Sequence, residues 1–273
     1  MSDSDRPETD PRAYDPDDDH AFPDDRLNAA LAAVEDDAEI TAYLEAQNVN
    51  PVTRKGYNDH GTKHVEIVRD RALRLYDLLK RGGVEFNGAR EQGLSEADEP
   101  VIVALAATLH DIGHVVHRDD HPYYSIPLAA DVLDRLLPEL GYDVAETVRL
   151  KGEVLHAILC HHTAEEPLTR EAGVVRVADA LDMEHGRSRI PYEKGGRGIN
   201  TISSQAIRSV TLRAGDAVPV TAEIEMVDAA GVYQVDELLK AKLHHSGIEE
   251  AVRIVAVNIH EEEEEKIVER IEM

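Results

Sequence analysis

The pair His110 and Asp111 ends an apolar segment, Val101–Leu109, in which Thr108 is the one polar residue. Such a segment predicts a buried helix that carries a polar pair at its end. Burying a carboxylate beside an imidazole is costly unless both groups are paired or bind a cation. Successive helical residues point about 100° apart, so the imidazole can bind one ion while the two carboxylate oxygens reach that ion and a second. The pair therefore predicts a metal site, although a hydrogen-bonded helix end is the simpler alternative.

Other histidines and an aspartate occur at similar places, near the ends of predicted helices. The further candidate ligands are His64, His121, His161, His162 and Asp179. A lone helical histidine usually belongs to the core or the surface, but this repeated placement is typical of a metal centre. Because the chain has one cysteine, Cys160, the ligands are imidazoles and carboxylates. This donor set suits Mn, Fe, Zn, Co or Ni in a reactive site better than a structural zinc site.

The series resembles the HD superfamily of metal-dependent phosphohydrolases over about residues 53–192. His64, in the segment His64–Arg69, is similar to the first histidine of that family. His110 and Asp111 match the doublet that gives the family its name, and Asp179 matches the closing aspartate. Residues 121–125 and 176–182 also resemble the HD-like domain of exopolyphosphatases.

The histidines that remain resemble the HD-GYP branch of this superfamily, in which such positions hold a second ion. The resemblance implies one ion on His64, His110, Asp111 and Asp179, and another on Asp111, His121, His161 and His162. His114 replaces the lysine of the HD-GYP motif, and Thr163–Pro167 replaces its Gly-Tyr-Pro segment, so hydrolysis of cyclic di-GMP is not implied. We expect His60, one turn before His64, to orient a ligand without contacting an ion.

The predicted chemistry is hydrolysis of a phosphomonoester or phosphodiester bond in a nucleotide-like small molecule by a metal-activated hydroxide. Asp111 would join two divalent ions, and His114 would donate a proton to the leaving group or hold a phosphate, unless its role is structural. Two other functions use a similar ligand set. One is a di-iron oxygenase that resembles myo-inositol oxygenase, and the other is a regulatory module that binds a nucleotide.

A basic segment follows the candidate ligands. It contains Arg187, Arg189 and Lys194 in an otherwise acidic chain. Guanidinium groups bind phosphate in a bidentate manner, so these residues are candidates for substrate binding. Ion pairing with nearby carboxylates is the alternative.

The chain carries a formal net charge of −26, from 55 acidic and 29 basic residues. At molar salt the Debye length is about 3 Å, so the self-repulsion of such a surface is largely screened. The charge therefore favours a halophilic, cytoplasmic protein, and it disfavours duplex nucleic acid and anionic membranes as partners. We expect a small phosphorylated substrate as the partner. No apolar segment reaches the roughly 18 residues of a membrane span, and the acidic start does not fit a signal peptide.

Hydrophobic periodicity predicts a mainly α fold, a box of helices around the metal site over residues 26–192. An acidic tail, residues 1–25, is expected to be disordered. The predicted helices cover residues 27–47, 53–81, 101–109, 122–137 and 144–159 and a segment around Asp179, and the motif Ser95–Asp98 is expected to cap the central helix.

Residues 193–273 form a small α+β appendage in this prediction. Alternation predicts a strand over 218–226 with a partner at Ser209–Arg213, followed by a helix over 235–243 and a more buried strand at Val252–Ile259. Glu261–Glu265 is expected to begin a frayed helix. Because its core is small, this appendage should pack on the helical domain or on a second copy of the chain in a homo-oligomer.

Overall fold

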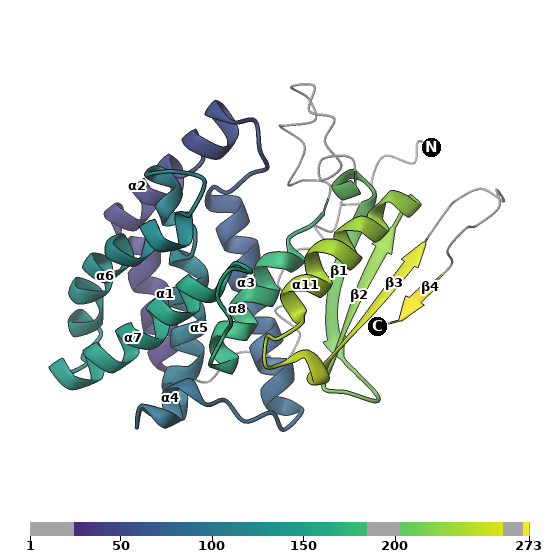
Figure 1. Ribbon diagram of the computed structural model, residues 1–273. Coiled ribbons are helices and arrows are strands. Elements are labelled where there is room, and N and C mark those ends of the chain that lie inside the picture. The colour runs from purple at the N-terminus through teal and green to yellow at the C-terminus, as the bar shows by residue number, and fades with distance from the viewer. Residues whose placement is uncertain (1–24, 185–202, 259–269, 273) are drawn as a thin grey trace, which may run out of the picture.

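The computed structural model describes residues 25–184, 203–258 and 270–272 (Figure 1). The predicted tail up to residue 24, the basic segment with Arg187, Arg189 and Lys194, the expected domain boundary at 192–193 and the run Glu261–Glu265 lie outside the described residues. Within these ranges the chain forms a helical domain and a C-terminal sheet domain, which lie on opposite sides of Figure 1. The predicted fold class, mainly α with an α+β appendage, is confirmed.

The helical domain surrounds one central helix, α5, which spans Glu99–Leu109 and is buried at every residue. It contacts helices α1, α3, α7 and α8. The other long elements are α1 (Asp25–Asp36), α2 (Ala38–Ala46), α3 (Thr62–Arg81), α6 (His121–Glu139), α7 (Val144–Cys160) and α8 (Arg170–Leu181). Shorter turns connect them: η1 (Val49–Arg54), α4 (Gly88–Glu91), η2 (Glu96–Asp98) and η3 (Ile112–Val115). The predicted cap is present, since Ser95 and Asp98 form a capping box at η2, which runs into α5.

Two predicted helices were too long. Residues 27–47 form two helices because the carboxylate of Asp37 accepts hydrogen bonds from the backbone of Glu39 and Ile40, which starts a new helix. The predicted helix 53–81 begins only at Thr62, and η1 is a separate π-helical turn before it. In both places the apolar spacing continued across a break between two helical elements.

The C-terminal domain contains a four-stranded sheet in the order β1-β2-β3-β4. Strands β1 (Ile207–Ala214) and β2 (Val220–Met226) are antiparallel, and β2 is parallel to β3 (Val252–Asn258). The connection from β2 to β3 contains η5 (Ala229–Gly231), η6 (Gln234–Leu239), α11 (Lys240–Leu243) and η7 (Glu249–Ala251). The short strand β4 (Arg270–Glu272) pairs antiparallel with β3 and was not predicted.

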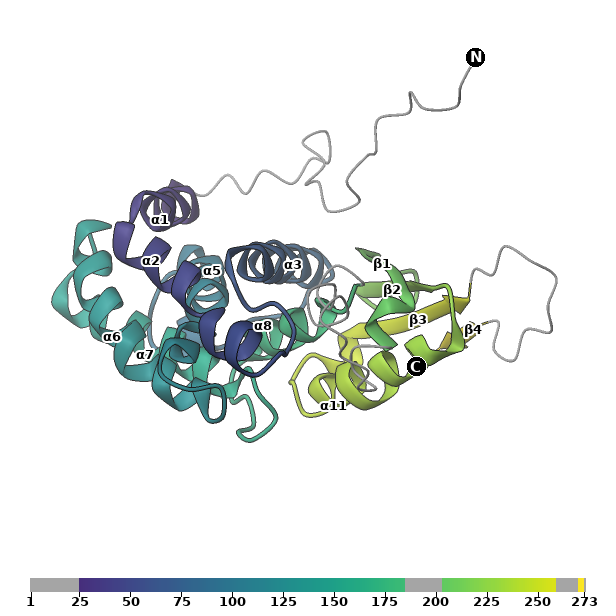
Figure 2. The ribbon, with the colours of Figure 1, turned by 90° about the horizontal axis from the view of Figure 1, so that it is seen from above.

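The two domains share one cluster of buried apolar side chains, which includes Leu105 of α5 and Ile224 of β2. Seen from above, α3 lies beside β1, and α11 lies along the other side of the sheet (Figure 2). The expectation that the appendage packs on the helical domain is therefore confirmed. Within the described ranges, no helix combines the length and the apolar character needed to cross a membrane.

Candidate metal centre

The predicted ligands come together where helices α3, α5, α6, α7 and α8 meet. His110 and Asp111 follow the last residue of α5, His64 lies in the first turn of α3, and His121 begins α6. His161 follows the last residue of α7, and Asp179 lies in the last turn of α8. All six side chains are buried. Buried polar groups need hydrogen-bond partners or a bound ion.

Backbone carbonyls fix the orientation of the imidazoles. Nδ1 of His110 donates to the carbonyl of Ala107 at 2.8 Å, and Nδ1 of His161 donates to the carbonyl of Ile158 at 2.6 Å. Nδ1 of His121 donates to the carbonyl of Arg118 at 3.0 Å. Since a carbonyl can only accept, each Nδ1 carries a proton, and in the neutral form of the ring Nε2 presents a lone pair. This is the tautomer in which histidine binds a metal through Nε2.

These lone pairs point at one another. Nε2 of His64 lies 3.3 Å from Nε2 of His110, and Nε2 of His121 lies 3.1 Å from Nε2 of His161. Two unprotonated nitrogens at such distances repel each other unless a cation lies between them. Zinc-to-histidine bonds are about 2.0–2.1 Å long, so neighbouring ligand atoms of one ion lie roughly 3.0–3.4 Å apart. The donor atoms therefore fit bound divalent ions.

Asp111 divides the donors into two groups. Its Oδ2 lies 3.4 Å from Nε2 of His64 and 3.4 Å from Nε2 of His110. Its Oδ1 lies 3.1 Å from Nε2 of His121 and 3.6 Å from Nε2 of His161. Oδ1 of Asp179 lies 3.4 Å from Nε2 of His64, so it joins the first group. Each oxygen of Asp111 thus faces a different pair of imidazoles.

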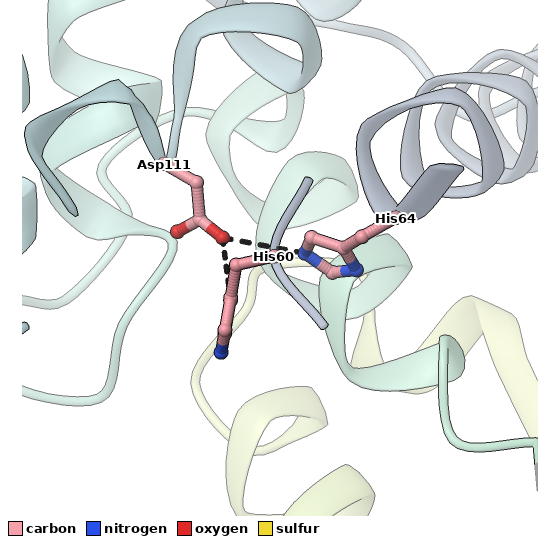
Figure 3. Close-up of side chains that lie close together, drawn as sticks. All are labelled: His60, His64 and Asp111. Carbon is pink, nitrogen blue, oxygen red and sulfur yellow. Dashed lines mark hydrogen bonds and ion pairs between the residues drawn. The ribbon is translucent and has the colours of Figure 1, made fainter. Parts of the chain in front are cut away.

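Residues around the ligands hold them in place. Nδ1 of His60 lies 2.7 Å from Oδ2 of Asp111, and Figure 3 shows both His60 and His64 directed at this carboxylate. Ser125 accepts from the amide of Gly113 and donates to the carbonyl of His110, both at 2.8 Å. These contacts fit the predicted role of His60 as a residue that orients a ligand.

The protonation states suit metal ligands. Burial alone would raise the pKa of Asp111, but attraction to His110, His114 and His60 outweighs it and holds that pKa well below the usual range. Burial lowers the pKa of His161 well below its usual range. The carboxylate is therefore ionised and this imidazole is neutral at pH 7, as metal binding requires.

His114 lies against the second group, in the turn η3. Because α5 ends at Leu109, His114 belongs to a separate turn and not to the helix that precedes His110. Its Nε2 lies 3.7 Å from Oδ1 of Asp111, and neither ring nitrogen has a hydrogen-bond partner in the part of the chain that the structure describes. Its donor atom also lies within 4.8 Å of those of Asp111 and His121, so His114 could contribute to a metal site.

His162 stands apart from the groups of donor atoms. Its ring centre is 5.6 Å from that of His121, and no group of three close donors among the described residues includes it. It lines a cavity of about 250 Å³ together with Arg118 and Tyr123. Its role as a metal ligand stays a prediction.

Two residues that contact the ligands were missed by the sequence interpretation. Asp182 accepts from Nδ1 of His64 at 2.6 Å, and Lys242 of α11 forms an ion pair with Oδ2 of Asp179. Asp182 follows Asp179 by three residues, just past the end of α8. Its closeness in sequence to a candidate ligand could have identified it as a residue of the centre. Lys242 lies 63 residues after Asp179 in another domain, and no local pattern connects the two.

His156 and Cys160 lie on a different side of α7 from the centre. Nε2 of His156 accepts from the amide of Leu168 at 3.0 Å, and its Nδ1 lies 3.6 Å from Sγ of Cys160. Burial raises the pKa of the Cys160 thiol to about 11, so it remains protonated at neutral pH. Cys160 is therefore a free, buried thiol away from the candidate ligands.

The close packing of η3 on α6 gives a first prediction. A Cβ added at Gly113 would lie 2.1 Å from the carbonyl oxygen of His121 and 2.5 Å from the amide nitrogen of Ser125. We expect Gly113→Ala to lower the free energy of unfolding by about 1–3 kcal/mol, because backbone must move to make room. Urea unfolding measures this.

Gly152 is the matched control. It lies within α7 and has open space around its Cα, so Gly152→Ala should raise the free energy of unfolding by about 0.5–1 kcal/mol. Equal effects of the two substitutions would show that the contact between η3 and α6 does not constrain the centre.

The buried imidazoles give a second prediction, for the metal-free protein. Burial lowers the pKa of His114 to about 2 and that of His162 to about 4. In the unfolded chain both pKa values return to about 6.5. Below this pH the unfolded chain binds protons that the folded chain does not bind, so stability decreases as the pH decreases.

We expect the free energy of unfolding in chelator to fall between about pH 6.5 and pH 5, by up to about 1.4 kcal/mol per pH unit for each such imidazole. Urea titrations across this range measure the slope. His114→Gln should reduce it. A free energy that is constant or rises as the pH falls would contradict the neutral state of these histidines.

Comparison with known proteins identifies relatives of this chain. The family described as HD domain matches residues 73–184, a range that contains every candidate ligand except His64. The uncharacterized protein MJ1020 of Methanocaldococcus jannaschii is 38% identical over 218 residues, which are 80% of this chain and 84% of that protein. Two proteins named ribonuclease Y are also similar. That of Desulforudis audaxviator is 35% identical over 94 residues, and that of Desulforamulus reducens is 36% identical over 101 residues. The matches cover only 15% and 17% of these two proteins.

Proposed function

Because the chain belongs to the HD domain family of metal-dependent phosphohydrolases, we propose that it hydrolyses a phosphomonoester or phosphodiester bond with the help of two divalent ions. The substrate in this proposal is a nucleotide-like small molecule. The observation that carries it is the division of the donor atoms by Asp111, whose Oδ1 and Oδ2 face different pairs of imidazoles.

In the proposed mechanism, His64, His110, Asp111 and Asp179 hold one ion, and Asp111, His121 and His161 hold the other. His162 or His114 completes the second group. The chemistry that the bound ions supply is a nucleophilic hydroxide at neutral pH and neutralisation of charge on the phosphoryl oxygens. His60 and Asp182 orient Asp111 and His64 through the hydrogen bonds described above.

The neutral ring of His114 is the proposed contact for the leaving-group oxygen or a phosphate oxygen. Its burial and its two ring nitrogens without partners among the described residues support a role toward a ligand. Arg187, Arg189 and Lys194 remain the proposed substrate-binding residues of the basic segment. Arg118, which lines the cavity beside His121 and His162, is a further cation at this place.

The similarity to proteins named ribonuclease Y supports a phosphodiester as one substrate class. The net charge of −26 favours a small molecule over a long nucleic acid, because a polyanion would be repelled along most of the surface. A panel should therefore include nucleoside monophosphates, cyclic and linear dinucleotides, and a short single-stranded RNA.

The test combines metal analysis with this panel in molar KCl, on protein loaded with Mn²⁺ or purified with its own metal. We expect release of phosphate or of a nucleotide from at least one small phosphoester. Protein that contains iron after aerobic purification, consumes oxygen and cleaves no phosphoester would contradict the proposal. That result would favour an oxygenase with the HD fold.

A further inference from the structure

Lys242 belongs to the C-terminal domain, yet its ammonium group lies at the metal centre. It forms an ion pair with Oδ2 of Asp179, while Oδ1 of the same carboxylate lies 3.4 Å from Nε2 of His64. Only 15% of the Lys242 side chain and 10% of the Asp179 side chain are exposed. The ion pair is therefore largely buried. The two carboxylate oxygens of Asp179 have different surroundings, since one faces Lys242 and the other faces His64.

We propose that Lys242 is a positioning residue that reserves Oδ2 of Asp179, so that Oδ1 alone is directed to the ion. The inference rests on the metal centre of the proposed function. A carboxylate with both oxygens available can bind an ion through both of them. An ammonium group on one oxygen prevents this, and a coordination position then stays open for water or substrate, as a catalytic site requires.

The backbone around Lys242 is fixed to the helix that carries Asp179. In α8, Nη2 of Arg176 lies 3.5 Å from the carbonyl of Ala241, one residue before Lys242. A Cβ added at Gly173 of the same helix would lie 1.9 Å from the carbonyl oxygen of Ser246. The segment 241–246 is thus docked closely on α8, which Figure 1 shows beside α11. The C-terminal domain supplies Lys242 to the centre in a defined position.

The charge of Lys242 argues for a role other than metal affinity. A positive group close to a divalent cation weakens the binding of that cation by repulsion. A lysine at this place therefore opposes ion binding unless it provides another benefit. Control of how Asp179 coordinates the ion provides one, and it leads to an unusual expectation: removal of the lysine should impair turnover without weakening the metal site.

The test compares Lys242→Met with Lys240→Met on the full chain. Methionine keeps the length of the side chain without its charge. Lys240 lies on the same helix, is exposed and pairs with Asp236 at 3.0 Å, so it is a matched control. Mn²⁺ affinity is measured by titration calorimetry, and turnover is measured with the best phosphoester of the panel.

We expect Lys242→Met to reduce kcat about 10–100-fold, the usual effect of losing a residue that orients a ligand, while Mn²⁺ binds as tightly as in the unmodified protein or more tightly. Lys240→Met should change neither quantity. Lys242→Arg, which keeps the charge, should recover most of the turnover. If Mn²⁺ affinity falls in parallel with kcat, Lys242 only supports the fold; if neither quantity changes, it does not position Asp179. Either result overturns the inference.

A double-substitution cycle with Asp179→Asn separates this inference from the proposed function. The asparagine side chain has only one oxygen, so in that background Lys242→Met changes Mn²⁺ affinity only by removing a repulsive charge. In the unmodified background it also frees Oδ2 of Asp179 for the ion, so the change in Mn²⁺ affinity should differ between the two backgrounds. Equal effects of Lys242→Met in both backgrounds would overturn the inference even if the substrate class proposed above were wrong. The cycle needs only Mn²⁺ binding and a thermal unfolding curve for each variant.

Discussion

Asp111→Asn is expected to reduce kcat/KM about a thousandfold or more, which corresponds to roughly 4 kcal/mol of transition-state stabilisation. Both oxygens of Asp111 face candidate ligand histidines, Oδ2 toward His110 and Oδ1 toward His121. Asparagine offers one neutral oxygen, so neither group of donors keeps its shared carboxylate. Steady-state kinetics with the best phosphoester, together with Mn²⁺ titration, measures both consequences.

His156→Gln is the control for this variant. His156 lies in α7, five residues before the candidate ligand His161. It accepts a hydrogen bond from the amide of Leu168 and takes part in no described group of donor atoms. We expect it to retain most of the activity and its full metal content. An equal loss in both variants, with intact folding, would mean that the ligands have been assigned to the wrong histidines.

Saturation at two divalent ions per chain is the second large effect that we expect. The Nε2 atoms of His64 and His110 lie 3.3 Å apart, and those of His121 and His161 lie 3.1 Å apart. Each pair can therefore bind an ion of its own. Ions bound only by the folded chain stabilise it by about 4.1 kcal/mol per site at a thousandfold excess over the dissociation constant. Chelation should therefore lower the thermal midpoint strongly, and added Mn²⁺ should restore it.

The variant His121→Gln distinguishes one ion from two. It removes a donor of the second group only, so we expect elemental analysis to fall from two ions toward one while the first group stays filled. A single ion at saturation in the unmodified protein would contradict the dinuclear centre. His64, His110, Asp111 and Asp179 would then form a mononuclear site.

Much of the helical domain could be predicted because its signals are local. The apolar run before His110 predicted a buried helix, and α5 is buried along its whole length. A helix was predicted over 122–137, and α6 begins one residue before that range, at His121. The alternating pattern before residue 227 predicted β2. These features depend on neighbours in the sequence, which share a helix face or a strand face.

The parts that escaped prediction depend on contacts between distant segments. The pairing of β4 with β3 brings together residues from separate parts of the C-terminal region. The ion pair of Lys242 and Asp179 joins two domains. The break at Asp37 depends on a carboxylate that caps the next helix, where the apolar spacing alone indicated continuity. The spacing of apolar residues indicates which face of a helix or strand is buried. It does not indicate which side chains from distant segments contact that face.

The complete burial of α5 has a consequence for amide hydrogen exchange. Helices α1, α3, α7 and α8 contact it on several sides, so its amides become accessible only when these neighbours separate. Segments of this kind open with free energies near that of global unfolding, whereas loops and chain ends open much more readily. His110 and Asp111 follow directly on the last residue of α5, and they are therefore attached to the slowest-exchanging part of the domain. We therefore expect local fluctuations that expose loops to leave His110 and Asp111 in place for as long as the domain stays folded.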